Sequence, residues 1–315
     1  MLWHRAWEPH ISSRFDTGAA RASTIRPMSI IGAAVGIGAQ DTRCRQGPDR
    51  LQACGLMARL ADEPHGVSWG GTVREDTGVD VVYASARFCE RLARKVYDAL
   101  QDNPRIGVVG GDHSCAIGTW SGVHQAIAGS GPLGLIWIDA HMDSHTPDTS
   151  PSGALHGMPL ACLLGHGPEA LTGLGVSGPK LAPQHVCLIG VRSFEPAEAA
   201  LLQKLGVRVL DMDQVRRHGL ARVMDDALAY VQKNTAGFGI SIDLDAIDPR
   251  DAPGVGSPVG AGICGKDLAE SLSNMGRHPG LLGLEIAEFN PDKDVNNRTA
   301  KLVIDLLAAT VGLRG

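Results

Sequence analysis

The stretch that decides the fold is residues 135–143, which read LIWIDAHMD. Its first four residues are all apolar, as expected of a strand that is buried on both faces of a sheet. The sequence then changes at once to Asp139, His141 and Asp143. Because residues two apart in an extended chain point to the same side, these three side chains converge. The stretch therefore predicts a buried strand with a polar cluster at its carboxyl end.

Strands of the same kind recur along the chain and alternate with segments of helical period. We predict strands at 30–35, 106–109, 135–138, 186–189, 239–242 and 281–286. The helix-like stretches between them include 84–100, 198–205 and 220–233. This alternation is typical of an α/β protein, here a doubly wound, mostly parallel sheet with helices on both faces.

Two further strands run directly into polar residues. Strand 106–109 is followed by Gly-Gly-Asp-His, which places His113 just past its carboxyl end, and strand 239–242 is followed by Asp243 and Asp245. The carboxyl ends of parallel strands meet at one edge of the sheet, where ligands bind in open α/β folds. Four carboxylates and two imidazoles are therefore expected at one place.

Such a cluster calls for metal ions. Carboxylates about 4 Å apart repel by about 4 kcal/mol per pair at an effective dielectric near 20. Six ligands suit two ions about 3.5 to 4 Å apart, which lower the pKa of a shared water. An oxygen-rich set without cysteine favours Mn²⁺ over Zn²⁺, with Ni²⁺, Co²⁺ and iron as alternatives. One such motif alone often only caps a helix, so the interpretation depends on the coincidence of three.

Composition restricts the partner. The 315 residues are 43% hydrophobic and 20% charged, as in a globular protein. A net charge of -5 offers no basic face for nucleic acid or an anionic membrane, and no apolar run is long enough to cross a bilayer. We therefore expect a small-molecule partner. Seven scattered cysteines without a C-x-x-C pair predict reduced core thiols in a cytoplasmic or matrix-like compartment.

The segment 1–27 differs from the rest of the chain, with four arginines and several serines against two acidic residues. It resembles a transit peptide weakly, which would place the protein in the mitochondrial matrix. The alternative is a disordered leader, or a start site assigned too early, because Met28 directly precedes the first strand. We predict a leader at 1–27 and a single catalytic domain at 28–315.

The chain resembles the ureohydrolases, the arginase and agmatinase family, over essentially everything after Met28. The matching stretches are GGDHSCAIG (110–118), WIDAHMDSHTP (137–147), SGALHG (152–157), SIDLDAIDP (241–249) and EIAEFNP (285–291). The resemblance implies a doubly wound parallel sheet, a homotrimer or hexamer, and a dimanganese centre. It implies these metal ligands: His113, Asp139, Asp143 and Asp243, completed by His141 and Asp245.

The same resemblance implies roles for two more residues. Glu288, in EIAEFNP, corresponds to the carboxylate that pairs with the substrate guanidinium. His156, in SGALHG, corresponds to the histidine proposed to shuttle protons to the leaving amine. With Asp143 they form the predicted catalytic set. Glu285 has no comparable match and is predicted to be structural.

Four positions concern the tail of the substrate. The SG-x-LHG loop is closer to arginases than to agmatinases, yet His145 and Ala154 stand where arginases have asparagines that serve the α-carboxylate. Ser152 keeps its match, and Glu195 stands where arginases place an aspartate facing the α-amino group. We predict that these four residues bind the substrate in an altered tail pocket.

The resemblance implies an enzyme in which hydroxide attacks a guanidinium carbon and releases urea, or a related product, and an amine. The alternatives to arginine are agmatine, a guanidino acid, formiminoglutamate, or a small or substituted guanidine. A different class of function is a non-catalytic subunit of a ureohydrolase complex. Such a subunit usually lacks metal ligands, whereas all six are present here.

Overall fold

The computed structural model describes residues 27–61, 66–76 and 80–312. In this part of the chain eight strands form one sheet in the order β2-β1-β3-β8-β7-β4-β5-β6, and every neighbouring pair is parallel. The strands are β1 Met28–Ala34, β2 Val67–Arg74, β3 Arg105–Gly110, β4 Leu133–Ile138, β5 Val186–Ile189, β6 Arg208–Leu210, β7 Gly237–Asp243 and β8 Leu281–Ala287. The predicted α/β fold with a parallel sheet is confirmed.

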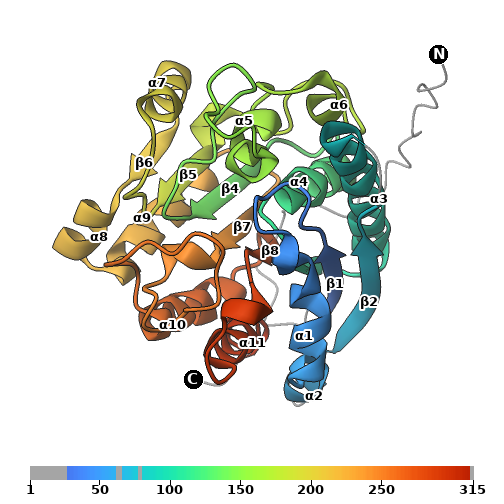
Figure 1. Ribbon diagram of the computed structural model, residues 1–315, viewed down its shortest axis with the longest axis vertical. Helices are drawn as coiled ribbons and strands as arrows, with labels where there is room; N and C mark the ends of the chain where they lie inside the picture. The colour runs from blue at the N-terminus through green and yellow to red at the C-terminus, as the bar shows by residue number, and fades with distance from the viewer. Residues whose placement is uncertain (1–26, 62–65, 77–79, 313–315) are drawn as a thin grey trace.

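Helices pack around this sheet (Figure 1). They are α1 Gly47–Ala53, α2 Leu56–Ala61, α3 Val81–Asp102, α4 Cys115–Ala126, α5 Pro159–Leu163, α6 Glu169–Thr172, α7 Pro196–Leu205, α8 Met212–His218, α9 Leu220–Val231, α10 Gly265–Gly276 and α11 Arg298–Val311. No helix of the described residues is both long and apolar enough to cross a membrane.

Two apolar cores lie on the two faces of the sheet, as strand β4 shows residue by residue. Ile136 and Ile138 belong to one core, with side chains of α1, α2 and α8 to α11. Leu135 and Trp137 belong to the other, with side chains of α3 to α7. The unbroken apolar run in the sequence is therefore explained by burial on both faces.

The six predicted strands correspond to β1, β3, β4, β5, β7 and β8, with ends that differ by at most two residues. The edge strands β2 and β6 were not predicted. Strand β2 is only partly buried and contains two adjacent glycines, and β6 has three residues. Neither has an apolar pattern that could be recognised.

The predicted helices 84–100 and 198–205 lie inside α3 and α7. The predicted helix 220–233 corresponds to α9, which ends two residues earlier than predicted, at Val231. Asn234 has a φ of 60°, a left-handed conformation that does not continue a right-handed helix. Residues 1–26 of the predicted leader lie outside the described residues.

The order of the sheet determines where the polar residues meet. Strands β3 and β4 follow each other in the chain, but β8 and β7 lie between them in the sheet. The four central strands are thus β3, β8, β7 and β4, and all four point in the same direction. Residues from four distant parts of the sequence are brought to one edge.

The loop after β3 is fixed between strands β1 and β8. Gly111 N donates to Ala33 O at 2.7 Å, and Gly111 O accepts from Glu288 N at 2.7 Å. A Cβ atom at Gly111 would lie 1.7 Å from Val35 O. Only glycine permits this approach, and it places His113 beside the end of β8.

We predict that Gly239→Ala destabilises the protein, because the added Cβ would lie 2.0 Å from Cζ3 of Trp120. Trp120 belongs to the core that contains the side chains of α3 to α7. Overpacking of this kind costs about 1 to 3 kcal/mol. Urea denaturation of the variant measures the change. Gly260→Ala is the matched control, since nothing lies within 4 Å of its Cβ. Equal stabilities of the two variants would show that the Trp120 ring can move away from the added Cβ without loss of stability.

Candidate metal centre

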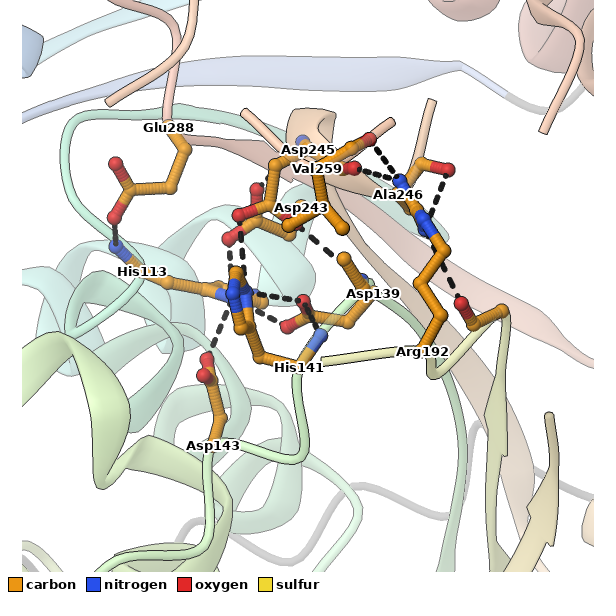
Figure 2. A network of polar contacts seen from close by, with 12 residues as sticks. His113, Asp139, His141, Asp143, Arg192, Asp243, Asp245, Ala246, Val259 and Glu288 are labelled. Atoms are coloured by element: carbon orange, nitrogen blue, oxygen red, sulfur yellow. Dashed lines mark hydrogen bonds and ion pairs between the residues drawn. The ribbon is translucent and has the colours of Figure 1, made fainter. Parts of the chain in front are cut away.

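The six predicted ligands lie in two adjacent groups (Figure 2). In the first, His113 Nδ1 faces three carboxylate oxygens: Asp139 Oδ2 at 3.3 Å, Asp143 Oδ2 at 3.0 Å and Asp243 Oδ2 at 3.2 Å. In the second, His141 Nδ1 lies 3.1 Å from Asp245 Oδ2 and 3.6 Å from Asp139 Oδ1. The ligand atoms of each group lie within 4.8 Å of one another, and Asp139 belongs to both.

Two buried atoms of the first group have no hydrogen-bond partner, namely His113 Nδ1 and Asp143 Oδ2. Buried polar atoms are normally paired, and an unpaired one requires an explanation such as an ion. A ring nitrogen and carboxylate oxygens directed at a common point are the ligands that divalent metals use. Two groups that share one carboxylate fit a pair of neighbouring ions.

The pKa values of the clustered residues also indicate that bound positive charge would stabilise the cluster. Burial, together with the charge of Asp139, raises the pKa of Asp143 to about 7. Burial and the charge of Asp245 raise the pKa of Asp243 well above its usual value. Burial alone would lower the pKa of His141, but its carboxylate neighbours outweigh burial and raise that pKa to about 12. Metal cations supply the same positive charge and displace these protons.

Two residues of the site have unusual backbone conformations. Asp143 has a φ of 48° and Glu288 a φ of 68°. Residues other than glycine rarely adopt these values, which cost about 1 to 3 kcal/mol and are concentrated at functional sites. Asp143 O accepts from Leu160 N at 3.0 Å, at the start of α5, which holds this turn in place.

Glu288 lies beside the first ligand group and is 4% exposed. Its Oε1 accepts from His113 N at 2.9 Å and lies 3.0 Å from His156 Nδ1. Burial would raise the pKa of Glu288, but His156 lowers it. Burial would lower the pKa of His156, but Glu288 raises it to about 10. The structure therefore brings Glu288 and His156 together as an ion pair at the edge of the cluster.

The predicted tail residues lie on two neighbouring segments. His145 Nε2 is 3.0 Å from Glu195 Oε2 and its Nδ1 is 3.2 Å from Thr149 Oγ1, so both ring nitrogens have partners within the protein. His145 N donates to Gly157 O at 3.0 Å, which ties it to the loop of Ser152 and Ala154. Ser152 is exposed, and its hydroxyl accepts from Ala154 N at 3.2 Å.

Sequence reasoning missed three residues around the site. Buried Glu198 accepts from Ser144 N and Glu195 N, and its position three residues after Glu195 at a helix start was the available signal. Cys44 Sγ donates to Glu288 Oε2 at 3.3 Å. The guanidinium of Arg192 donates to five backbone carbonyls, among them that of Asp245 at 2.7 Å (Figure 2). No sequence pattern pointed to Cys44 or Arg192.

All seven cysteines are free thiols, and five of them are buried. The prediction of core thiols was wrong for Cys264, which is exposed, and for Cys54, which is half-buried. Both lie at helix boundaries, at the start of α10 and after α1, where the chain is near the surface.

Comparison with known proteins agrees with this geometry. A model of the arginase family matches residues 26–312. The arginase of Bacillus caldovelox is 37% identical over 298 residues, which cover 91% of this chain and 99% of the relative. The arginase of Brevibacillus brevis is also 37% identical, over 90% of this chain and 97% of its own.

Solved structures give the same result. The structure of Bacillus caldovelox arginase superposes with a TM-score of 0.86 at 36% identity, over 92% of this chain and 99% of that one. Arginase from Bacillus subtilis superposes with a TM-score of 0.85 at 34% identity and the same coverage. A shared fold, a family model that spans nearly the whole chain and relatives above 30% identity lead to one conclusion: the chain belongs to the arginase family.

Proposed function

We propose that this protein hydrolyses a guanidino compound at a binuclear metal centre and releases urea, or a related product, and an amine. The observation that supports this most directly is the pair of ligand groups that share Asp139, with the Glu288–His156 pair beside them. The relatives named above are arginases. A non-catalytic role receives no support, because all six ligand positions are filled by metal-binding side chains.

The two ions would be held by His113, Asp143 and Asp243 on one side and His141 and Asp245 on the other, with Asp139 between them. We propose Mn²⁺, since four carboxylates and two imidazoles without a thiolate form a hard ligand set, with Ni²⁺ and Co²⁺ as alternatives. When bound, such a metal pair supplies a hydroxide nucleophile near neutral pH.

Glu288 is suited to hold the guanidinium. It is buried and ionised, and a carboxylate can pair with a planar guanidinium through two parallel hydrogen bonds. In the ligand-free protein its Oε1 is already paired with His156. An entering guanidinium therefore competes with His156 for the same carboxylate.

This competition gives His156 its proposed role. The pKa of His156 is about 10 because of Glu288. Once the guanidinium neutralises Glu288, the pKa of His156 falls towards its ordinary value, and the imidazolium becomes a better acid. We propose that it then donates its proton to the departing amine nitrogen, which must be protonated to leave.

The tail pocket would not favour an α-carboxylate. Ala154 offers only a methyl group, and the ring nitrogens of His145 already have partners. Glu195 and Glu198 add negative charge on the same side, at 3.0 and 3.6 Å from His145 Nε2. We propose that the preferred substrate is a guanidine with a tail other than that of arginine, which Ser152, His145, Ala154 and Glu195 line.

From the family resemblance we also infer a homotrimer or hexamer of one catalytic domain, residues 28–315, located in the cytoplasm. If residues 1–27 act as a transit peptide, the location is the mitochondrial matrix. Light scattering of the purified protein and imaging of tagged chains with and without residues 1–27 test these inferences.

We expect that removal of metal abolishes urea release and lowers the melting temperature, because the bare carboxylates repel one another. The experiment is dialysis against a chelator, followed by separate reconstitution with Mn²⁺, Ni²⁺ and Co²⁺ and assay over a set of guanidino compounds. Full activity in a sample shown to be metal-free by elemental analysis would contradict the proposal.

Asp243→Asn and Asp245→Asn should each reduce kcat by orders of magnitude while the fold survives, since each removes charge from the centre and leaves an ion short of a ligand. Circular dichroism checks the fold, and urea release gives kcat. Asp226→Asn is the matched control, because Asp226 is a partly exposed aspartate on α9 that pairs with Arg222 and belongs to neither ligand group. Near wild-type turnover with both metals bound would refute the ligand assignment.

The double variant His145→Asn with Ala154→Asn should gain specificity for arginine. Each hydrogen bond restored to the charged α-carboxylate is worth about 1.5 to 3 kcal/mol, or roughly tenfold or more in kcat/KM. The measurement compares kcat/KM for arginine, agmatine, guanidino acids and small guanidines in both proteins. If the wild type already prefers arginine by a wide margin, the altered tail pocket is not what selects the substrate.

A further inference from the structure

Glu285 is a fully buried carboxylate in strand β8, connected to His113 through the hydroxyl of Ser241. Its Oε1 accepts from Thr119 Oγ1 at 2.6 Å and Cys115 Sγ at 3.4 Å, both of α4. Its Oε2 accepts from Trp120 Nε1 at 3.1 Å and from Ser241 Oγ at 2.8 Å. The donors come from α4 and β7, and none of the four is a basic side chain. A carboxyl group buried among neutral donors needs a reason beyond packing, because an apolar residue would fill the space at lower cost.

Ser241 links this carboxylate to a proposed metal ligand. Its Oγ lies 2.8 Å from Glu285 Oε2 and 3.0 Å from His113 Nε2. Ser241 Oγ donates its single hydroxyl proton to Glu285 Oε2. The Ser241 oxygen can then only accept, and it accepts the proton that His113 has on Nε2.

This direction determines the tautomer of His113. A neutral imidazole with its proton on Nε2 has a bare lone pair on Nδ1. Nδ1 is the atom that faces Asp139, Asp143 and Asp243 and has no hydrogen-bond partner. A metal ligand needs that bare nitrogen, and a partner on the opposite nitrogen raises its basicity.

Stacking on Trp137 also restrains the ring of His113, but it does not select a tautomer. The imidazole stacks on the indole of Trp137, with ring centroids 4.3 Å apart and an angle of 22° between the planes. Stacking fixes the plane of the ring, but it does not distinguish the two nitrogens. The carboxylates that face Nδ1 attract a proton to that nitrogen in the metal-free protein. With a metal ion as the partner of Nδ1 instead, Ser241 and Glu285 would hold the one remaining ring proton on Nε2.

We propose that Glu285 is a positioning residue of the metal centre. Through the hydroxyl of Ser241 it holds His113 with Nδ1 free for the metal, and its negative charge increases the electron density of the ring. The inference rests on the proposed function only in taking His113 as a ligand. It replaces the prediction from sequence that Glu285 is merely structural.

The test measures Mn²⁺ binding to the metal-free full-length protein by equilibrium dialysis with elemental analysis, well below the unfolding temperature. Ser241→Ala removes the link. Glu285→Gln removes the charge, yet its amide oxygen can still accept from Ser241 and Trp120 while its amide nitrogen turns to the Thr119 oxygen. Each variant should weaken the affinity for one of two ions by about 10- to 100-fold, the usual effect of losing an outer partner of a metal ligand.

Thr119→Val is the matched control. It removes a different donor to Glu285 and should lower the melting temperature of the metal-free protein, but shift the affinity for Mn²⁺ by no more than about threefold. A role limited to packing predicts that all three variants lose stability and none loses affinity. That outcome would overturn the inference.

A double-mutant cycle tests whether Glu285 acts through Ser241. In the Ser241→Ala background, Glu285→Gln should change the affinity for Mn²⁺ far less than it does alone. Fully additive effects would contradict the linkage. If the wild-type protein binds none of Mn²⁺, Ni²⁺ and Co²⁺, the proposed function fails instead. If it binds two ions and the variants bind them as tightly, only the inference about Glu285 fails.

Discussion

The constraint on which the rest of the structure depends is the repulsion among four carboxylates buried at one edge of a sheet. Asp139, Asp143, Asp243 and Asp245 are all nearly inaccessible to solvent, where like charges interact more strongly than in water. Cations are needed to hold them together, and the surrounding structure keeps the ligands in position for those cations. Three parallel strands, β3, β4 and β7, deliver the proposed ligands, and Asp143 adopts a strained backbone conformation to complete the set.

Much of this centre could be predicted from sequence because strands have a simple geometry. An apolar run followed by Asp-x-His-x-Asp determines both the face and the end of the sheet at which the side chains appear, whatever the rest of the chain does. The same rule applies to His113, Asp243 and Asp245. The proposed metal ligands are local features of single strands, and only their meeting point is tertiary.

Other features depend on contacts between distant segments and have no local pattern. Cys44 reaches Glu288 across 244 residues, and Ser241 meets His113 across 128. Strand β6 exists because it pairs with β5, not because its three residues favour a strand. The left-handed φ of Glu288 is imposed by its hydrogen bond to the loop after β3, since nothing in the sequence EIAEFNP favours it.

The two ends of the proposed substrate site are built from different kinds of structure. The residues proposed to act on the guanidinium of the substrate lie at the carboxyl ends of strands. The residues assigned to its tail lie on the loop 144–158 and at the start of α7. Loops tolerate substitution better than central strands do. His145 and Ala154 can therefore differ from their arginase counterparts without any change at the metal ligands. Within one family this arrangement lets the tail of the substrate change while the chemistry of the guanidinium is kept.

The position of β7 and β8 between β3 and β4 has a consequence for biosynthesis. Ribosomes make the chain from its amino terminus, so β3 and β4 emerge long before the two strands that fill the gap between them. A nascent chain that ends at β6 contains His113, Asp139, His141 and Asp143 but lacks strands β7 and β8, which lie between β3 and β4 in the sheet. We therefore expect metal to bind late, after release of the carboxyl-terminal third, and a prematurely terminated chain has four of the six proposed ligands but no complete centre.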